Sequence, residues 1–178
     1  SKNEYTHYEQ LLFSTISAAQ QNSQIDFSSD DTVFIFSTTK GNISLLESQP
    51  VNEELIARMN LYHSASLITS AFGNSNKPVV ISNACISGVV ALLYARRLLL
   101  SGKYQNAVVA GADTISKFVY SGFKSFQALS QGICRPFSAA RDGINLGEAG
   151  ATIIVSCTSE NTYGSDNIFI EDGSISND

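Results

Sequence analysis

Three short runs of mostly apolar, β-branched and aromatic residues constrain the fold of this chain more than any other feature. The runs are TVFIF at 32–36, VVI at 79–81 and NAVVA at 106–110. A strand that is apolar at consecutive rather than alternate positions is buried on both faces of its sheet. The stretches between the runs have helical periodicity, so the sequence predicts repeated βα units and a mostly parallel sheet with helices on both faces.

The helical stretches are residues 8–21, 52–72 and 87–100, in which apolar side chains recur at intervals of three and four. Gly73 and Gly102 follow the second and third stretches, in positions typical of helix C-terminal caps. The third stretch, SGVVALLYARRLLL, is apolar nearly all round. We therefore expect a buried helix there.

Two more runs near the end of the chain, ATIIVSC at 151–157 and NIFIE at 167–171, predict further strands. The turn-forming residues between them would allow these two strands to pair antiparallel. The expected sheet therefore has five strands. With 178 residues, 43% of them apolar and 15% charged, the chain is long enough to bury a core, and we expect one α/β domain over residues 1–178.

Charge and cysteine content exclude several classes of partner. The 11 Lys and Arg residues against 16 Asp and Glu residues give a net charge of −5, which argues against nucleic-acid binding. The three cysteines form no CxxC pair, so we expect no disulfide framework, metal or cofactor, and a reducing, cytoplasmic compartment. The longest apolar run, at 89–100, is interrupted by Arg96 and Arg97 and is too short to span a membrane.

Cys85 lies where the second predicted strand ends and the third predicted helix begins. The N–H groups and the positive dipole end of a helix N-terminus stabilise a thiolate and can bind the oxyanion of an acyl-transfer intermediate. Ala84, Ser87 and Gly88 are small and leave room for a substrate. Because a free cysteine can also be a small buried apolar residue, these features make Cys85 a candidate nucleophile and no more.

Five segments of the chain match the motifs of one enzyme family in order and spacing. They are 33–47, 82–88, 110–113, 122–130 and 134–151. The segment around Cys85 reads SNACISG, and the last reads CRPFSAARDGINLGEAGA. The former resembles the nucleophile motif, and the latter the CRPFD…RDG…LGEGAG stretch, of the β-ketoacyl-acyl-carrier-protein synthases.

This resemblance implies a thiolase-like fold of two similar α/β halves, with this chain as the N-terminal half and a fragment of a larger chain. It implies acyl transfer from the phosphopantetheine thioester of an acyl carrier protein to Cys85, whose own N–H would be one oxyanion donor. A malonyl thioester would then lose carbon dioxide, and the resulting enolate would attack the acyl-enzyme. The pathway implied is fatty-acid or related acyl-chain biosynthesis.

The decarboxylation step uses histidines from the C-terminal half in that family. The two histidines of this chain, His7 and His63, both precede Cys85 and lie in helical patterns without the family's histidine motifs around them. We therefore expect both to be surface or helix-packing residues. We also expect the isolated chain not to complete the condensation.

The resemblance assigns further residues by position. Phe123 and Phe126 fall in the segment that lines the acyl channel of the family, and we expect Phe123 to contact substrate. Asp142 and Glu148 match charged positions, but acceptors near turns commonly bond local N–H groups, so we expect them to brace the loop. Ser138 replaces an Asp of the family motif.

Two alternatives stay open from the sequence. The chain could be a non-catalytic thiolase-like partner subunit or carrier-protein-binding module, although the intact motif around Cys85 argues against an inert partner. It could be a thiolase or coenzyme A ester synthase, which the RPF…RDG…LGE stretch fits less well. Residues 79–83 correspond to the dimer edge of the family, so we expect a homodimer in the parent protein.

Overall fold

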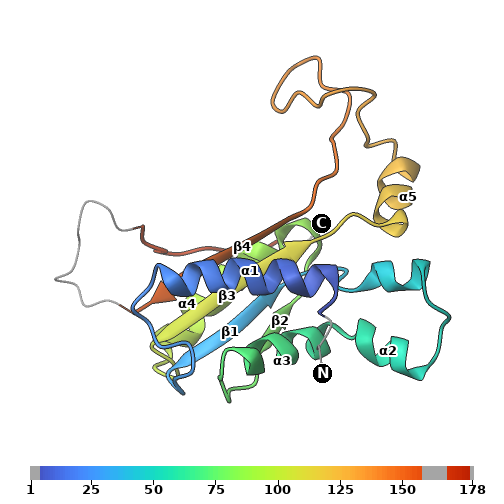
Figure 1. Ribbon diagram of the computed structural model, residues 1–178. Helices are drawn as coiled ribbons and strands as arrows, with labels where there is room; N and C mark the ends of the chain where they lie inside the picture. Colours follow the sequence, from blue (N-terminus) through green and yellow to red (C-terminus); the bar gives the residue numbers. More distant parts are fainter. Residues whose placement is uncertain (1–4, 158–167, 177–178) are drawn as a thin grey trace.

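The strand β1 (Thr32–Ser37) lies inside a four-stranded sheet of order β2-β1-β3-β4 in the computed structural model, which describes residues 5–157 and 168–176 (Figure 1). It pairs in parallel with β2 (Val79–Ile81) and β3 (Asn106–Asp113). The fourth strand, β4 (Ala149–Ser156), is antiparallel to β3. The three predicted strands and their parallel pairing are confirmed, but β2, at the edge of the sheet, is half-buried and not buried on both faces.

Both faces of β1 are buried, as its unbroken apolar pattern predicts. Phe34 and Phe36 belong to a core cluster with α1 (His7–Gln21) and α3 (Leu61–Ala71). Val33 and Ile35 belong to a second cluster with α4 (Ser87–Leu100) on the other face. The sheet is therefore the middle layer between helices, as Figure 1 shows.

Helix α1 begins at a capping box. Glu9 N donates to Thr6 Oγ1, and Thr6 N donates to Glu9 Oε2 at 2.9 Å, so two N–H groups without helical partners are satisfied. Tyr8, Leu12 and Ile16, spaced four apart, form its buried stripe. This matches the predicted helix over 8–21.

The single helix predicted over 52–72 is instead two helices, α2 (Glu53–Met59) and α3. Asn60, between them, has extended backbone and caps α3, with its Oδ1 accepting from Tyr62 N at 2.9 Å. An Asn side chain that bonds nearby N–H groups competes with helix continuation, which explains the break. Gly73 has a φ of +73°, as expected of a residue that ends a helix.

Helix α4 is buried mainly on the face toward the sheet. Ala91, Ala95 and Leu99 pack on the sheet, whereas Val89 and Leu100 are 60% and 67% exposed. The burial predicted from its nearly uniform apolar sequence is therefore confirmed for the face toward the sheet. The opposite face is partly covered by residues 170–173 and is otherwise exposed.

The fifth strand expected over 167–171 is absent from the described residues, which corrects the predicted strand count. Asn167 lies outside those residues, and 168–171 has no strand pairing. Arg96 Nε, on α4, donates to the carbonyl of Ile170 at 3.0 Å, so this segment crosses the helix. The predicted strand at 151–157 corresponds to β4, which bonds along the free edge of β3 over eight residues instead of pairing with 167–171.

After β3 the chain leaves the sheet through α5 (Lys117–Ser125) and a long loop that returns at β4, forming the arm at the upper right of Figure 1. Two short 3-10 helices complete the described elements, η1 (Ile43–Glu47) and η2 (Ala84–Ile86). No helix in the described ranges is long and apolar enough to cross a bilayer.

Candidate active site

The parallel register brings three loops together at one edge of the sheet. Ser37, the last residue of β1, is aligned with Ile81 at the end of β2 and with Gly111 near the end of β3. The carboxyl ends of parallel strands form the edge at which α/β proteins place ligands. Cys85 follows β2 and Lys40 follows β1, so both belong to this edge.

Cys85 lies in η2, at the turn from β2 into α4, and is exposed. Ala84 has a φ of +43°, an uncommon conformation for a residue with a side chain. Ser87 Oγ holds the turn by donating to the Ala84 carbonyl at 2.7 Å and accepting from Asn83 N at 2.8 Å. The cysteine thus precedes the free N–H groups of the first turn of a 14-residue helix.

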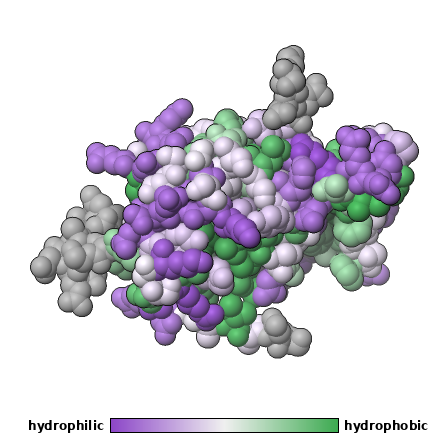
Figure 2. Space-filling model, turned by 90° about the horizontal axis from the view of Figure 1, so that it is seen from below, coloured by the Kyte–Doolittle hydropathy of each residue, from purple (hydrophilic) through white to green (hydrophobic). Residues whose placement is uncertain are grey.

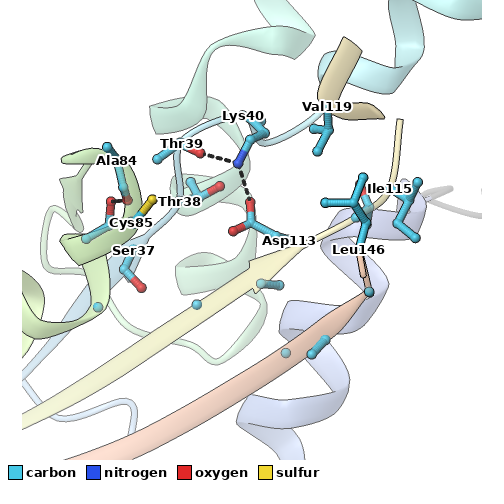
Figure 3. Close-up of a pocket in the computed structure, with 18 of the residues that line it drawn as sticks. Ser37, Thr38, Thr39, Lys40, Ala84, Cys85, Asp113, Ile115, Val119 and Leu146 are labelled. Atoms are coloured by element: carbon cyan, nitrogen blue, oxygen red, sulfur yellow. Dashed lines mark hydrogen bonds and ion pairs between the residues drawn. The ribbon is translucent and has the colours of Figure 1, made fainter. Parts of the chain in front are cut away.

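Cys85 opens onto a cavity of about 720 Å³ (Figure 3). Phe123 also lines this cavity, so the structure brings together the two residues that the sequence assigned to catalysis and substrate contact. Phe126 is 80% exposed and is not part of the lining. The other lining residues are small, hydroxylated or apolar, apart from Lys40 and Asp113: Ser37, Thr38, Thr39, Ala84, Ser87, Gly88, Gly111, Ala112, Thr114, Ile115, Phe118, Val119, Leu146, Gly147, Ala149, Gly150 and Ala151.

The lack of a side chain at Gly111 shapes the floor of the cavity. A Cβ at this position would lie 3.0 Å from the Ser37 carbonyl oxygen and would also collide with Ser37 Oγ. Only glycine therefore allows the ends of β1 and β3 to approach as they do beneath the cavity.

Lys40 and Asp113 carry opposite charges into the cavity, and the sequence interpretation missed both as site residues. Lys40 Nζ lies 3.8 Å from Asp113 Oδ1 and donates to Thr39 Oγ1 at 2.6 Å (Figure 3). Their positions directly after β1 and at the end of β3 are the signal that could have identified them.

The loop that carries Lys40 is fastened to the core. Gly41 has a φ of +50°, and a Cβ there would collide with Leu61 Cδ2 at 2.6 Å. Asn42 is buried and donates through Nδ2 to Glu9 Oε1 at 3.1 Å and Ser64 Oγ at 3.0 Å. These contacts fix the conformation of the turn that follows Lys40.

Glu9 is fully buried and is the centre of that polar cluster. It accepts hydrogen bonds from Thr6 N, Asn42 Nδ2 and Ser64 Oγ, and it forms an ion pair with Arg58. A buried carboxylate with this many donors has its charge compensated.

Tyr8 lies beside the same loop. The pKa of Tyr8 is raised to about 12, mainly by burial, with a smaller contribution from the negative charge of Asp113, while a hydrogen bond with the Thr38 side chain opposes the rise. The phenol is therefore neutral over the physiological range.

Asp142 and Glu148 bond loop groups, which agrees with the bracing role expected of them. Asp142 accepts from Ser130 Oγ at 2.8 Å, the main cause of the lowered pKa of its carboxyl, and from Gln131 N. Glu148 accepts from His7 Nε2 and Ile115 N, both at 2.8 Å, and these bonds lower the pKa of Glu148.

Neither histidine lines the Cys85 cavity. His7 bonds Glu148, and His63 Nε2 lies 3.1 Å from an Arg58 nitrogen, so both take part in helix and loop packing. Across the part of the chain that the structure describes, no three His, Cys, Asp or Glu residues are grouped as metal ligands.

Comparison with known proteins adds independent findings. The family model "Beta-ketoacyl synthase, N-terminal domain" matches residues 8–161. Probable polyketide synthase 10 of Dictyostelium discoideum is 28% identical over 158 residues, which cover 83% of this chain and 6% of that protein. The 3-oxoacyl-acyl-carrier-protein synthase 2 of Mycobacterium leprae (strain TN) is 32% identical over 81 residues, 41% of this chain and 19% of that protein.

A solved structure shares the fold. The ishigamide ketosynthase/chain length factor superposes with a TM-score of 0.70 at 22% identity, covering 86% of this chain and 43% of that one. The likeness confirms the predicted α/β, thiolase-like class. The chain spans less than half of this structure and at most about a fifth of the two curated relatives.

Proposed function

Since the chain belongs to the β-ketoacyl synthase family, whose N-terminal domain matches residues 8–161, we propose that Cys85 is the thiol that accepts an acyl group from a carrier-bound thioester. The observation that carries this proposal is the position of Cys85, at the start of α4 and on the wall of the 720 Å³ cavity. An exposed thiol beside free helix N–H groups can be reached by a substrate and has donors for an oxyanion.

The acyl transfer forms one carbon–sulfur bond and breaks another. The Cys85 thiolate attacks the thioester carbonyl carbon, and the carbonyl oxygen becomes an oxyanion that backbone N–H groups of the turn can bind. When the intermediate collapses, the bond to the phosphopantetheine sulfur breaks. That sulfur leaves as a thiolate and takes the proton that Cys85 released.

The donor proposed is an acyl carrier protein, and the pathway is fatty-acid or related acyl-chain biosynthesis. A malonyl-carrier thioester would supply the second carbon nucleophile by loss of carbon dioxide. That step needs donors for the enolate oxygen, and neither His7 nor His63 reaches the Cys85 cavity. We therefore expect this chain alone to form the acyl-enzyme but no β-ketoacyl product, as a single domain that corresponds to the N-terminal half of a synthase.

Mass spectrometry tests the acyl transfer. The chain is incubated with an octanoyl-carrier thioester and digested, and peptides containing each of the three cysteines are compared. We expect the octanoyl mass on the Cys85 peptide and not on that of Cys157, which is also exposed and serves as the matched thiol. A folded chain with no adduct on Cys85 would support the non-catalytic alternative and overturn this proposal.

We further propose that the parent protein is a homodimer that pairs through β2. This strand has three half-buried residues and lies at the edge of the sheet. Apolar surface gathers on the face seen from below, the side on which β2 and α3 lie (Figure 2). Sedimentation of the full-length protein tests the idea, and a monomer at micromolar concentration would reject it.

A further inference from the structure

The Cys85 cavity contains one pair of opposite charges in an otherwise uncharged lining. Among the residues that the structure places around it, only Lys40 and Asp113 carry a charge, and the apolar part of the lining includes Val119, Phe123 and Leu146. Lys40 follows β1, the strand between β2, which leads to Cys85, and β3, which ends at Asp113. Sheet order therefore places the Lys40 loop between the two strands that carry the thiol and the carboxylate.

The ammonium group is held in place but keeps donor capacity. Lys40 Nζ donates to Thr39 Oγ1 and faces Asp113 Oδ1 at 3.8 Å, while an ammonium has three protons to donate. The anchoring of the next two residues, Gly41 and Asn42, limits how far the loop can move.

An acyl group that binds beside Lys40 and Asp113 must displace the water around these two side chains. The side chains of Lys40 and Asp113 are 28% and 55% exposed, so water still solvates them in the open cavity. A hydrocarbon chain lying against the pair would remove that water and return no hydrogen bond, which is unfavourable. A chain with a keto or hydroxyl oxygen would replace the water with a bond to Nζ.

Resting on the proposed acyl transfer to Cys85, we propose that Lys40 is a specificity-determining residue that selects acyl groups bearing a neutral keto or hydroxyl oxygen over plain hydrocarbon chains. Asp113 sharpens this selection. Its carboxylate balances the charge of Lys40 and repels an acyl group that ends in a carboxylate, so the pair favours neutral oxygen.

A competition experiment tests the role of Lys40. Equal amounts of octanoyl and 3-hydroxyoctanoyl pantetheine thioesters are offered, and the two adducts on Cys85 are quantified by mass spectrometry. One hydrogen bond predicts a preference of about five- to tenfold for the hydroxylated chain. Lys40→Met should bring the ratio to about one, whereas Lys77→Met, an exposed lysine before β2, should leave it unchanged.

A second variant tests the pair independently of how Lys40→Met folds. Asp113→Asn removes the repelling carboxylate, so transfer from a thioester with a terminal carboxylate, such as the adipoyl half-thioester, should rise about five- to tenfold. An unchanged hydroxyl preference in folded Lys40→Met, or no preference in the original chain, overturns the inference while acyl transfer stands. No Cys85 adduct from any thioester would instead refute the proposed function itself.

Discussion

His7 Nε2 lies 2.8 Å from Glu148 Oε2, a contact between residues 141 positions apart. The other carboxylate oxygen of Glu148 accepts from Ile115 N at 2.8 Å. One side chain therefore joins the start of α1, the loop after β3 and the residue before β4. Ile115 and Ala149 line the Cys85 cavity, so this carboxylate braces the cavity wall.

The Glu148→Gln variant should be less stable than the original chain at neutral pH. Hydrogen bonds from His7 and Ile115 lower the pKa of Glu148 below its ordinary 4.5, so the charged form stabilises the fold above that pH. As pH falls through the lowered pKa, this contribution disappears. We expect a deficit of about 0.5–1 kcal/mol at pH 7, as for a solvent-screened pair.

Thermal unfolding midpoints at pH 7 and pH 3 measure this effect. The midpoint of Glu148→Gln should be ~1–4 °C lower at pH 7, with little difference at pH 3. Glu171→Gln, at an exposed carboxylate, is the control. A deficit of the same size at both pH values would show that the charge of Glu148 is irrelevant.

Replacement of Glu9 should cost more, because its carboxylate is buried. The Glu9→Ala variant removes the acceptor for Asn42 and Ser64 and the counter-charge of Arg58. Loss of one partner of a buried pair predicts a decrease of about 3 kcal/mol in the free energy of unfolding. Urea denaturation measures it, with exposed Gln20→Ala on the same helix as the control; equal midpoints for both variants would contradict the prediction.

Phe123→Ala should weaken transfer of long acyl groups to Cys85. If the ring contacts the acyl chain, its removal lowers the acylation rate from a dodecanoyl thioester by about tenfold and has little effect on an acetyl thioester. Phe126→Ala is the matched control, since that ring lies outside the cavity lining. Equal losses for both variants, or for both thioesters, would remove Phe123 from the substrate path.

Alanine substitutions at two glycines should have opposite effects on stability. Gly41→Ala puts a side chain at a φ of +50° and against Leu61, so we expect a loss of at least about 1–2 kcal/mol. Gly122→Ala, inside α5 with open space around it, should gain about 0.5–1 kcal/mol from helix propensity. Urea midpoints compare the two, and a stable Gly41→Ala would mean that the loop tolerates rearrangement.

The central strands were predictable because each contains a run of consecutive apolar residues, a local sequence pattern that indicates burial on both faces. An unbroken TVFIF can be satisfied only by packing on both faces, and β1 is buried on both. The break between α2 and α3 at Asn60 and the lack of a strand at 168–171 were not predictable, because each depends on which of two competing partners forms the hydrogen bond. The Asn60 side chain caps α3, and Ile170 bonds Arg96 from α4 instead of a strand.

The candidate site divides in the same way. Cys85 could be located from its position between a strand and a helix, and Phe123 from the matched segment, and both line one cavity. The Lys40–Asp113 pair depends on strand order and on a turn that Asn42 anchors to Glu9, 33 positions earlier in the chain. Neither the strand order nor the contact between Asn42 and Glu9 is indicated by a local sequence pattern.

The central place of β1 in the sheet has a consequence for synthesis. Its neighbours β2 and β3 begin only at Val79 and Asn106, so a strand with four consecutive apolar residues, 33–36, leaves the ribosome on the order of seconds before either partner exists. Until then the strand is a target for chaperones and for other nascent chains. We expect ribosome-bound chains that end before β3 to be cleaved by protease near β1, and chains extended past β4 to resist.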